Sequence, residues 1–194
     1  LGRLKVATEW LSDPQRIHRE ALAMKWLARF ADPAFFTELI YEDRAAHVIA
    51  MSAVPEPFEN WKTQLMEGRI DSSVVSQFAE LLAAIHVNSH AQLKDLPWEF
   101  CDKSFFESLR LQPYYGFAAS RVPRAADFLG KLSQQGRSLA ISLVHGDYSP
   151  KNVLVHNGRI VLLDHEVAHV GDPAFDVGFA LTHLLSKARH FPEQ

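Results

Sequence analysis

The fold of this chain is decided by the stretch LVHGDYSPKNVLV at residues 143–155. The apolar run at residues 139–144 that leads into it has the length and composition of a strand. The polar turn after this run carries Asp147, and Asn152 follows after four intervening residues. We therefore expect a strand that delivers these two polar side chains to one turn.

A β-hairpin is predicted directly after this turn. The runs at residues 153–156 and 159–163 flank an Asn-Gly pair, which is the strongest short-range hairpin signal. Asp164 stands where the returning strand ends. Because a tight hairpin brings its two ends together, we expect Asn152 and Asp164 to be neighbours.

The residue types at this hairpin suit phosphoryl transfer. Amide and carboxylate oxygens close together suit Mg²⁺, which accepts a few oxygen ligands and bridges substrate phosphates. A carboxylate at the preceding turn is placed to accept a proton from a hydroxyl group. Such a transfer demands little covalent chemistry of the protein, so three well-placed oxygen donors are enough.

Upstream of this region, the sequence predicts a helix and a short strand. The helix is expected to begin at Asp13 and Pro14 and to run to about residue 30. Glu20 lies beside its apolar stripe and would want a cation if it were buried. A run of strand length follows at residues 47–53, before the prolines of the next segment. The expected buried stripe of the helix is Ile17, Ala21, Met24 and Ala28.

Helical spacing also predicts the elements between the strand and the hairpin, and after it. Residues 71–90 are the clearest helix. Weaker helices are expected over residues 102–111 and 123–135, and a last one opens at Asp172. The expected buried face of the clearest helix is Val74, Val75, Phe78, Leu81, Leu82 and Ile85.

The composition is that of one soluble globular domain. The 194 residues are 47% hydrophobic and 22% charged, with a net charge of -3, which excludes intrinsic disorder. No apolar window is long enough for a membrane span, and no basic run suggests a nucleic-acid partner. Cys101 stands alone and cannot close an intrachain disulfide, so we expect a cytoplasmic location. The oligomeric state stays open.

Three motifs together resemble a known family. They are H-G-D-x4-N at residues 145–152, L-D-x-E at 163–166 and G-D-P-x-x-D at 171–176. The chain resembles the aminoglycoside phosphotransferase and choline kinase-like family of small-molecule kinases, with some similarity to methylthioribose kinases. The resemblance implies an α+β, protein-kinase-like fold, with a mostly helical C-terminal lobe that holds a small β-hairpin and a partial N-terminal lobe of one helix and a hinge strand. Residues 1–54 would be the remnant of the nucleotide-binding lobe and hinge, and residues 55–194 a catalytic lobe that is truncated at its C-terminus.

The resemblance also implies roles for individual residues. Asp147 would be the catalytic base, and Asn152 and Asp164 would complete the catalytic set as ligands of Mg²⁺. Glu20 resembles the helix glutamate that pairs with the nucleotide-binding lysine. ATP would donate the phosphate, and the acceptor would be a hydroxyl group of a small polar metabolite. The implied hinge residues that hold the nucleotide are Met51, Ser52 and Ala53.

Some positions are implied supports or depart from the family pattern. His145 and Asp176 would brace the catalytic loop, and His165 stands after Asp164 where an aromatic residue is usual. No G-x-G-x-x-G is present, so the glycine-rich loop is expected before residue 1. Lys5 is the only upstream candidate for the phosphate-binding lysine, although a surface position suits it better.

Other interpretations stay open from sequence alone. A non-catalytic pseudokinase-like scaffold or a small-molecule-binding module is the main alternative, and a metal-dependent hydrolase is a more distant one. A zinc site built on histidines 156, 165 and 169 is disfavoured, because no cysteine lies near them in the sequence and they are not spaced along a helix. Large aromatic residues such as Trp61, Trp98, Phe106 and Tyr114 are interpreted as core. The cluster of arginines at 110, 121 and 124 is interpreted as a solvated face.

Overall fold

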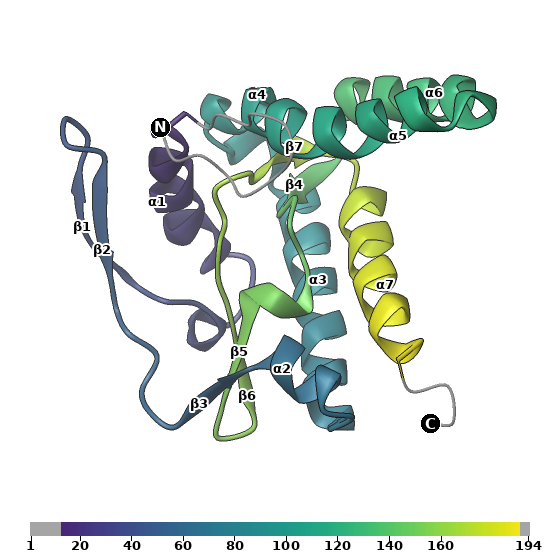
Figure 1. The fold of residues 1–194 in the computed structure, drawn as a ribbon. Coiled ribbons are helices and arrows are strands. Elements are labelled where there is room, and N and C mark those ends of the chain that lie inside the picture. Colours follow the sequence, from purple (N-terminus) through teal and green to yellow (C-terminus); the bar gives the residue numbers. More distant parts are fainter. Residues whose placement is uncertain (1–12, 191–194) are drawn as a thin grey trace.

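The computed structural model describes residues 13–190 of the chain. A two-stranded hairpin stands at one side, a layer of helices crosses the top, and further helices and strands lie beneath that layer (Figure 1). This mixture of helices with a few short antiparallel strands agrees with the expected α+β, kinase-like class. Lys5 lies outside the described residues. No helix between residues 13 and 190 is long and apolar enough to cross a membrane.

The first helix, α1 (Arg16–Leu27), begins slightly later than the sequence predicts. Asp13 and Pro14 form the preceding turn, in which Asp13 Oδ1 accepts a hydrogen bond from the Gln15 N–H at 2.9 Å. The buried face is also rotated from the predicted stripe, because Arg19 on it donates to the Ala168 carbonyl at 2.8 Å. This bond ties α1 to the motif region of the chain. The buried residues of α1 are Arg19, Glu20, Ala21, Ala23, Met24 and Leu27.

A hairpin follows α1 in the chain. Strand β1 (Leu39–Asp43) pairs antiparallel with β2 (Val48–Met51). The predicted strand at residues 47–53 contains β2, whereas β1 was missed because its short run ends in two acidic residues. Beyond β2, the Ser52 N–H donates to the Glu38 carbonyl at 2.8 Å, so the pairing continues by one residue.

The predicted late hairpin is present. Strands β5 (Val153–His156) and β6 (Arg159–Leu162) pair antiparallel around the Asn-Gly turn. Strand β3 (Phe58–Asn60) adds to the outer side of β5, so the sheet order is β3-β5-β6. The sequence had given no sign of β3, which is only three residues long.

A second small sheet joins the motifs. Strand β4 (Ser142–Val144), which leads into the H-G-D turn, pairs antiparallel with β7 (His169–Gly171). β7 follows the L-D-x-E element. This pairing fixes the two motif loops against each other, and it was not predicted because nothing local marks the partner of so short a strand.

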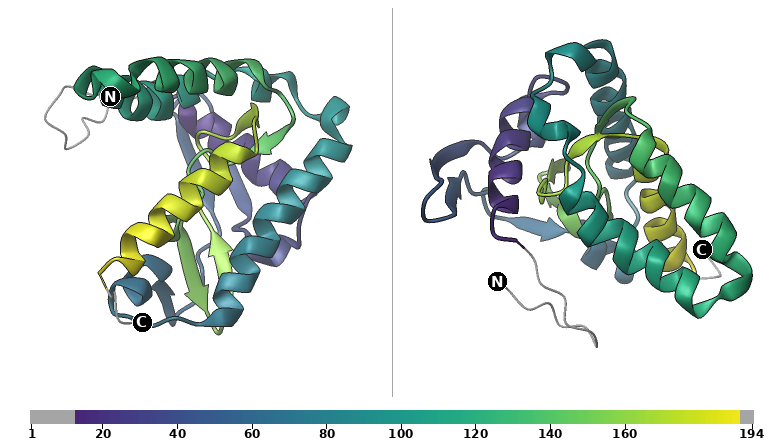
Figure 2. Two further views of the ribbon diagram at one scale, coloured as in Figure 1. Left: turned by 90° about the vertical axis from the view of Figure 1, so that its right-hand side faces the viewer. Right: turned by 90° about the horizontal axis from the view of Figure 1, so that it is seen from above.

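Helices make up most of the remainder, and α4, α5 and α6 form one layer over the rest (Figures 1 and 2). The helix predicted at residues 102–111 extends further, through a π-helical segment that contains Pro113. Because proline lacks the N–H of a regular turn, it favours this looser winding. The helices are α2 (Trp61–Met66), α3 (Ser72–Ala91), α4 (Ser104–Phe106), the π-helical segment Glu107–Gly116, α5 (Phe117–Arg121), α6 (Ala126–Ser138) and α7 (Ala174–Ala188).

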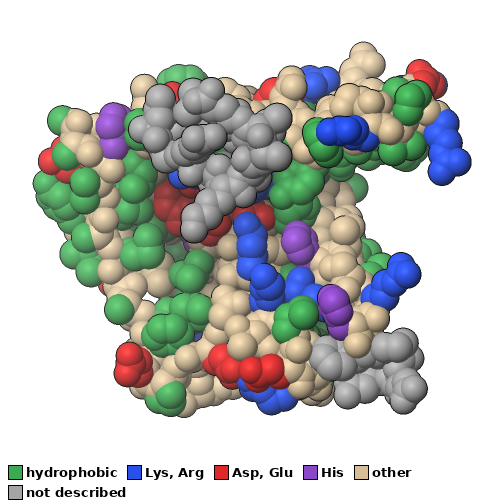
Figure 3. Space-filling model, in the orientation of Figure 1, with side chains coloured by type: hydrophobic (Ala, Val, Ile, Leu, Met, Phe, Trp, Pro, Cys, Tyr) green, Lys and Arg blue, Asp and Glu red, His purple; other side chains and the backbone are tan. Residues whose placement is uncertain are grey.

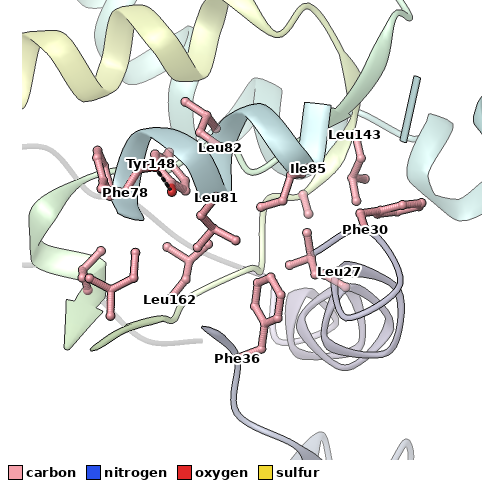
Figure 4. Close-up of a cluster of buried hydrophobic side chains, with 14 of the residues drawn as sticks. Leu27, Phe30, Phe36, Phe78, Leu81, Leu82, Ile85, Leu143, Tyr148 and Leu162 are labelled. Carbon is pink, nitrogen blue, oxygen red and sulfur yellow. Dashed lines mark hydrogen bonds between the residues drawn. The ribbon is translucent and has the colours of Figure 1, made fainter. Parts of the chain in front are cut away.

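The hydrophobic core lies between α3, α1 and the motif strands (Figure 4). Tyr148, next to the expected base Asp147, stacks on Phe78 with ring centroids 4.2 Å apart and donates its hydroxyl to the Phe78 carbonyl at 2.7 Å. The H-G-D turn is therefore anchored in the core. Of the predicted face of α3, only Val75 is exposed. The core side chains labelled in the figure are Leu27, Phe30, Phe36, Phe78, Leu81, Leu82, Ile85, Leu143, Tyr148 and Leu162.

The large aromatic side chains divide between core and surface. Trp61 and Phe106 are buried, as expected. Trp98 is 76% exposed and Tyr114 is 48% exposed, so the interpretation of these two as core residues was wrong.

Candidate active site

The H-G-D turn needs glycine at its centre. Gly146 has a φ of +79°, which L side chains rarely adopt. A Cβ atom there would lie 2.9 Å from Cγ2 of Val167 and 3.1 Å from its carbonyl oxygen. Both the backbone conformation and the close approach of the Val167 segment therefore exclude a side chain at this position.

Asp176 braces this turn from α7. Its two carboxylate oxygens accept the backbone N–H groups of His145 and Gly146, each at 2.8 Å, and Nε2 of His86 lies 3.0 Å from it. Burial alone would raise the pKa of Asp176. The hydrogen bond from His86 and the charge of the neighbouring His145 lower it by more, so the pKa of Asp176 lies below its ordinary value. The expected brace of the catalytic loop is thus a buried, ionised carboxylate.

His145 and His165 form a buried pair that links the two motif loops. The Asp147 N–H donates to Nδ1 of His145 at 3.2 Å, and Nε2 of His145 lies 3.0 Å from Nδ1 of His165. This pattern assigns the proton of His145 to Nε2. Burial lowers the pKa of both rings. His165, in place of the usual aromatic residue, also packs edge-on against Phe36 with centroids 6.0 Å apart.

Asp147 is buried at the head of the turn and carries two cationic neighbours. Its Oδ2 lies 2.8 Å from Nη2 of Arg110 and 2.8 Å from Nζ of Lys151. Neither contact has regular hydrogen-bond geometry, so charge rather than alignment holds Oδ2. Oδ1 has no protein partner among the described residues. The carboxylate therefore keeps one oxygen for a further donor.

Arg110 is the neighbour of Asp147 that the sequence analysis placed wrongly. It is 7% exposed rather than part of a solvated face. Its Nε donates to the Gly146 carbonyl and its Nη1 to the Leu109 carbonyl, both at 2.8 Å, while Nη2 faces Asp147. The planar fork of the guanidinium group can hold all three contacts together.

No local signal identified Arg110, because it lies 36 positions before Gly146. Lys151 was also missed, although its spacing did contain a signal. It follows Asp147 by four positions, and the short turn between them brings the two side chains together.

Asn152 and Asp164 meet as the hairpin predicts. The Asn152 carbonyl accepts the Leu163 N–H at 2.9 Å, which places Asp164 beside the turn. Nδ2 of Asn152 donates to the Asp147 carbonyl at 3.0 Å, so its Oδ1 is left for another partner. Asp164 has a left-handed φ of +67° and is half-buried. One amide oxygen and one carboxylate fit a Mg²⁺ ion that takes its other ligands from phosphates and water.

A cavity of about 520 Å³ opens between α1, β2 and the segment after β6. Its acidic wall holds Glu20, Asp164 and Glu166, and its apolar wall includes Met51. Acidic and basic side chains meet in the hollow at the middle of the face in Figure 3. The other two expected hinge residues, Ser52 and Ala53, do not line this cavity; they line a separate one of about 190 Å³.

Glu20 is buried in that acidic wall without a cation. Its Oε2 has no hydrogen-bond partner among the described residues, while Arg16 pairs with Glu166 at 2.5 Å. Burial raises the pKa of Glu20 to about 8, and the charges of Asp164 and Glu166 add to the shift. The nearby Arg16 opposes this shift only in part, and Glu20 forms no ion pair with any residue between 13 and 190.

Replacing Glu20 by glutamine is expected to remove a pH dependence of stability. Below pH 4.5 the carboxyl is protonated in both the folded and unfolded states, and between 4.5 and about 8 only the unfolded state ionises. The free energy of unfolding of the unchanged chain thus falls as pH rises through this window. In urea denaturation, the free energy of unfolding of Glu20→Gln minus that of the unchanged chain is therefore expected to rise by more than about 1 kcal/mol from pH 5 to pH 8.5. For Glu80→Gln, at an exposed position, this difference should not change with pH. An equal rise for Glu80→Gln would contradict the raised pKa of Glu20.

The three histidines considered for zinc lie in separate contacts. His165 bonds His145, His169 stacks on Phe106 with centroids 4.1 Å apart, and His156 bonds the Pro57 carbonyl. Over residues 13–190, no group of three or more His, Cys, Asp or Glu side chains is arranged to hold a metal ion.

Comparisons with known proteins agree with this architecture. The model of the phosphotransferase enzyme family matches residues 9–191. The apo form of a thermostable mutant of aminoglycoside phosphotransferase APH(4)-Ia is similar with a TM-score of 0.52 and 19% identity, over 92% of this chain and 68% of that one. At this identity the likeness shows a shared fold.

Two further solved structures are more distant. A ternary complex of APH(4)-Ia with ADP and hygromycin B has a TM-score of 0.48 and 19% identity, over 90% of this chain and 68% of that one. Choline kinase LicA from Streptococcus pneumoniae has a TM-score of 0.43 and 16% identity, over 94% of this chain and 65% of that one. No curated protein matches the chain.

Proposed function

The chain belongs to the phosphotransferase enzyme family, whose model matches residues 9–191, and we propose that it transfers the γ-phosphate of ATP to a hydroxyl group of a small molecule. Membership makes it a small-molecule kinase. The observation that carries the finer proposal is the buried carboxylate of Asp147, whose Oδ1 has no hydrogen-bond partner among residues 13–190 while Oδ2 faces two cations.

The transfer itself follows from these positions. The acceptor hydroxyl gives its proton to Oδ1 of Asp147, and its oxygen forms a bond to the γ-phosphorus. The bond between that phosphorus and the β,γ-bridging oxygen breaks, and ADP leaves with the electron pair. Lys151, whose side chain is 47% exposed, is able to turn from Asp147 toward the transferring phosphoryl group.

The nucleotide would lie in the cavity that Glu20, Met51 and Asp164 line. Its apolar wall suits a purine ring, and its acidic wall suits a metal-bound phosphate. Asn152 and Asp164 would hold Mg²⁺, which neutralises charge between the β- and γ-phosphates when bound. In this proposal residues 1–54 belong to the nucleotide-binding part and residues 55–194 to the catalytic part, and Met51 is the expected hinge residue that lines the nucleotide cavity.

The proposal is tested by nucleotide binding. Asp164→Asn removes the carboxylate ligand, so calorimetry with ADP is expected to show at least about a tenfold loss of affinity when Mg²⁺ is present and little change when it is absent. Asp127→Asn is the matched control, because Asp127 is exposed and forms an ion pair with Lys131. Unchanged Mg²⁺-dependent affinity in Asp164→Asn would count against the ligand role. A chain that binds the nucleotide but forms no ADP from ATP with any acceptor would instead support the non-catalytic binding module.

A further inference from the structure

A second cavity, of about 530 Å³, lies between the π-helical segment Glu107–Gly116, α6 and α7. It shares no lining residue with the cavity of Glu20 and Asp164. Figure 3 shows a notch below the upper helices, with hydrophobic side chains along its roof. The volume lies within the range of roughly 300 to 1,000 Å³ that is usual for small-molecule sites.

Aromatic rings form the walls of this second cavity. Phe175 and Phe179 on α7 are stacked with centroids 5.6 Å apart, and Tyr114 meets Phe179 edge-on at 6.0 Å. Tyr115 lies against Phe175 at 6.4 Å. Such a set of rings offers faces and edges to a flat apolar group, which it binds by burial and by ring stacking.

The polar groups of the second cavity do not suit a highly charged ligand. Among residues 13–190, Asp172 supplies the only carboxylate in the lining, and its oxygens accept hydrogen bonds from the Ala174 N–H at 3.0 Å and from Nε2 of Gln135 at 3.2 Å. In the described part of the chain, none of the lining residues is lysine or arginine. A polycation would find one engaged carboxylate among residues 13–190, so it would lose hydration without repayment in ion pairs.

The second cavity is connected to the catalytic carboxylate. The π-helical segment that lines it also carries Arg110, whose guanidinium group faces Asp147. His183, on the α7 wall, lies within the field of Asp147: burial lowers the pKa of His183, and the charge of Asp147 opposes that shift. Leu111 in the lining directly follows Arg110, so the cavity wall adjoins the partner of the group that would receive the acceptor's proton.

We propose that the second cavity binds the acceptor, and that the acceptor is an alcohol that carries a planar apolar ring and at most one positive charge, with its hydroxyl group directed toward Asp147. This inference rests on the proposed phosphotransfer and specifies its substrate class. It distinguishes this chain from an enzyme for polycationic aminosugars or for purely polar sugars.

Two glycines provide a matched test. A Cβ atom added at Gly178 or at Gly130 meets nothing within 4 Å, but Gly178 lines the second cavity and Gly130, on α6, does not. Leucine at Gly178 therefore fills the cavity, and leucine at Gly130 points into open space. Each change replaces a helical glycine by a better helix former, which stabilises a helix by up to about 1 kcal/mol, so both variants are expected to fold.

The probes are tyrosol as an aromatic alcohol, ribose as a polar one and kanamycin as a polycation, each titrated calorimetrically in the presence of ADP and Mg²⁺. We expect tyrosol to bind most tightly, and Gly178→Leu to weaken it at least about tenfold while Gly130→Leu stays within about twofold. Equal tyrosol binding in the two variants overturns the inference, as does kanamycin or ribose binding that only Gly178→Leu abolishes. ADP formation from ATP is followed separately. If phosphate is transferred to ribose and Gly178→Leu does not affect this transfer, the phosphotransfer stands and the cavity assignment is overturned. If Gly178→Leu loses tyrosol binding but no probe leads to ADP formation, the phosphotransfer alone is overturned.

Discussion

Replacing Asp147 by asparagine is expected to lower the rate of phosphoryl transfer at least about 10³-fold while leaving nucleotide affinity within about threefold. The amide keeps the shape of the side chain, but it cannot take the proton of the acceptor hydroxyl. It also places a neutral group against Arg110 and Lys151, which both face the native carboxylate at 2.8 Å. The nucleotide cavity does not include this position, so ADP binding is expected to survive.

The measurement for Asp147→Asn is ADP release from ATP in the presence of an acceptor, together with calorimetry of ADP and near-ultraviolet circular dichroism. Asp127→Asn serves again as the control for an ordinary loss of one surface carboxylate. If Asp147→Asn kept more than about a tenth of the transfer rate in a folded protein, Asp147 would not be the base.

Replacing Arg110 by methionine is expected to lower the free energy of unfolding by about 3 to 5 kcal/mol and the transfer rate by at least about 10²-fold. The side chain is 8% exposed, and its loss leaves the buried Asp147 with only the half-exposed Lys151 as a partner. The Gly146 carbonyl also loses its donor. Arg110→Lys is expected to recover only part of both losses, because an ammonium group cannot reach three acceptors in a fixed plane.

A double-mutant cycle separates this ion pair from ordinary packing. When Arg110→Met is combined with Asp147→Asn, the loss of free energy of unfolding should be smaller than the sum of the two single losses by at least about 1 kcal/mol. The reason is that Asp147→Asn removes the charge that Arg110→Met leaves uncompensated. Urea denaturation of the four proteins gives the coupling energy. Arg124→Met, at an exposed position, is the control and should change stability by no more than about 0.5 kcal/mol. Additive losses for Arg110 and Asp147 would mean that their contact carries no energy.

Several features of the site were predictable because their causes are local. The Asn-Gly turn between β5 and β6 determines a hairpin, and the hairpin brings Asn152 beside Asp164. Glu20 lies on the buried face of α1, and helical periodicity predicted the position of that face to within less than one turn. The assignment of catalytic and metal-binding roles to these residues came from the family resemblance and stays a proposal.

The sequence by itself therefore determined the hairpin and the neighbourhood of Asn152 and Asp164, since strand and helix periods and turn preferences act over a few positions. Its three motifs also carried the resemblance that implied the kinase-like class. Only the tertiary structure decided that β4 pairs with β7, that Arg110 leaves the surface to face Asp147, and that aromatic residues of α7 and the π-helical segment enclose a second cavity. Each of these depends on contacts between residues far apart in the chain. Such contacts form where the packing of whole elements buries apolar surface and leaves a buried charge in need of its partner, and neither cause leaves a pattern in the local sequence.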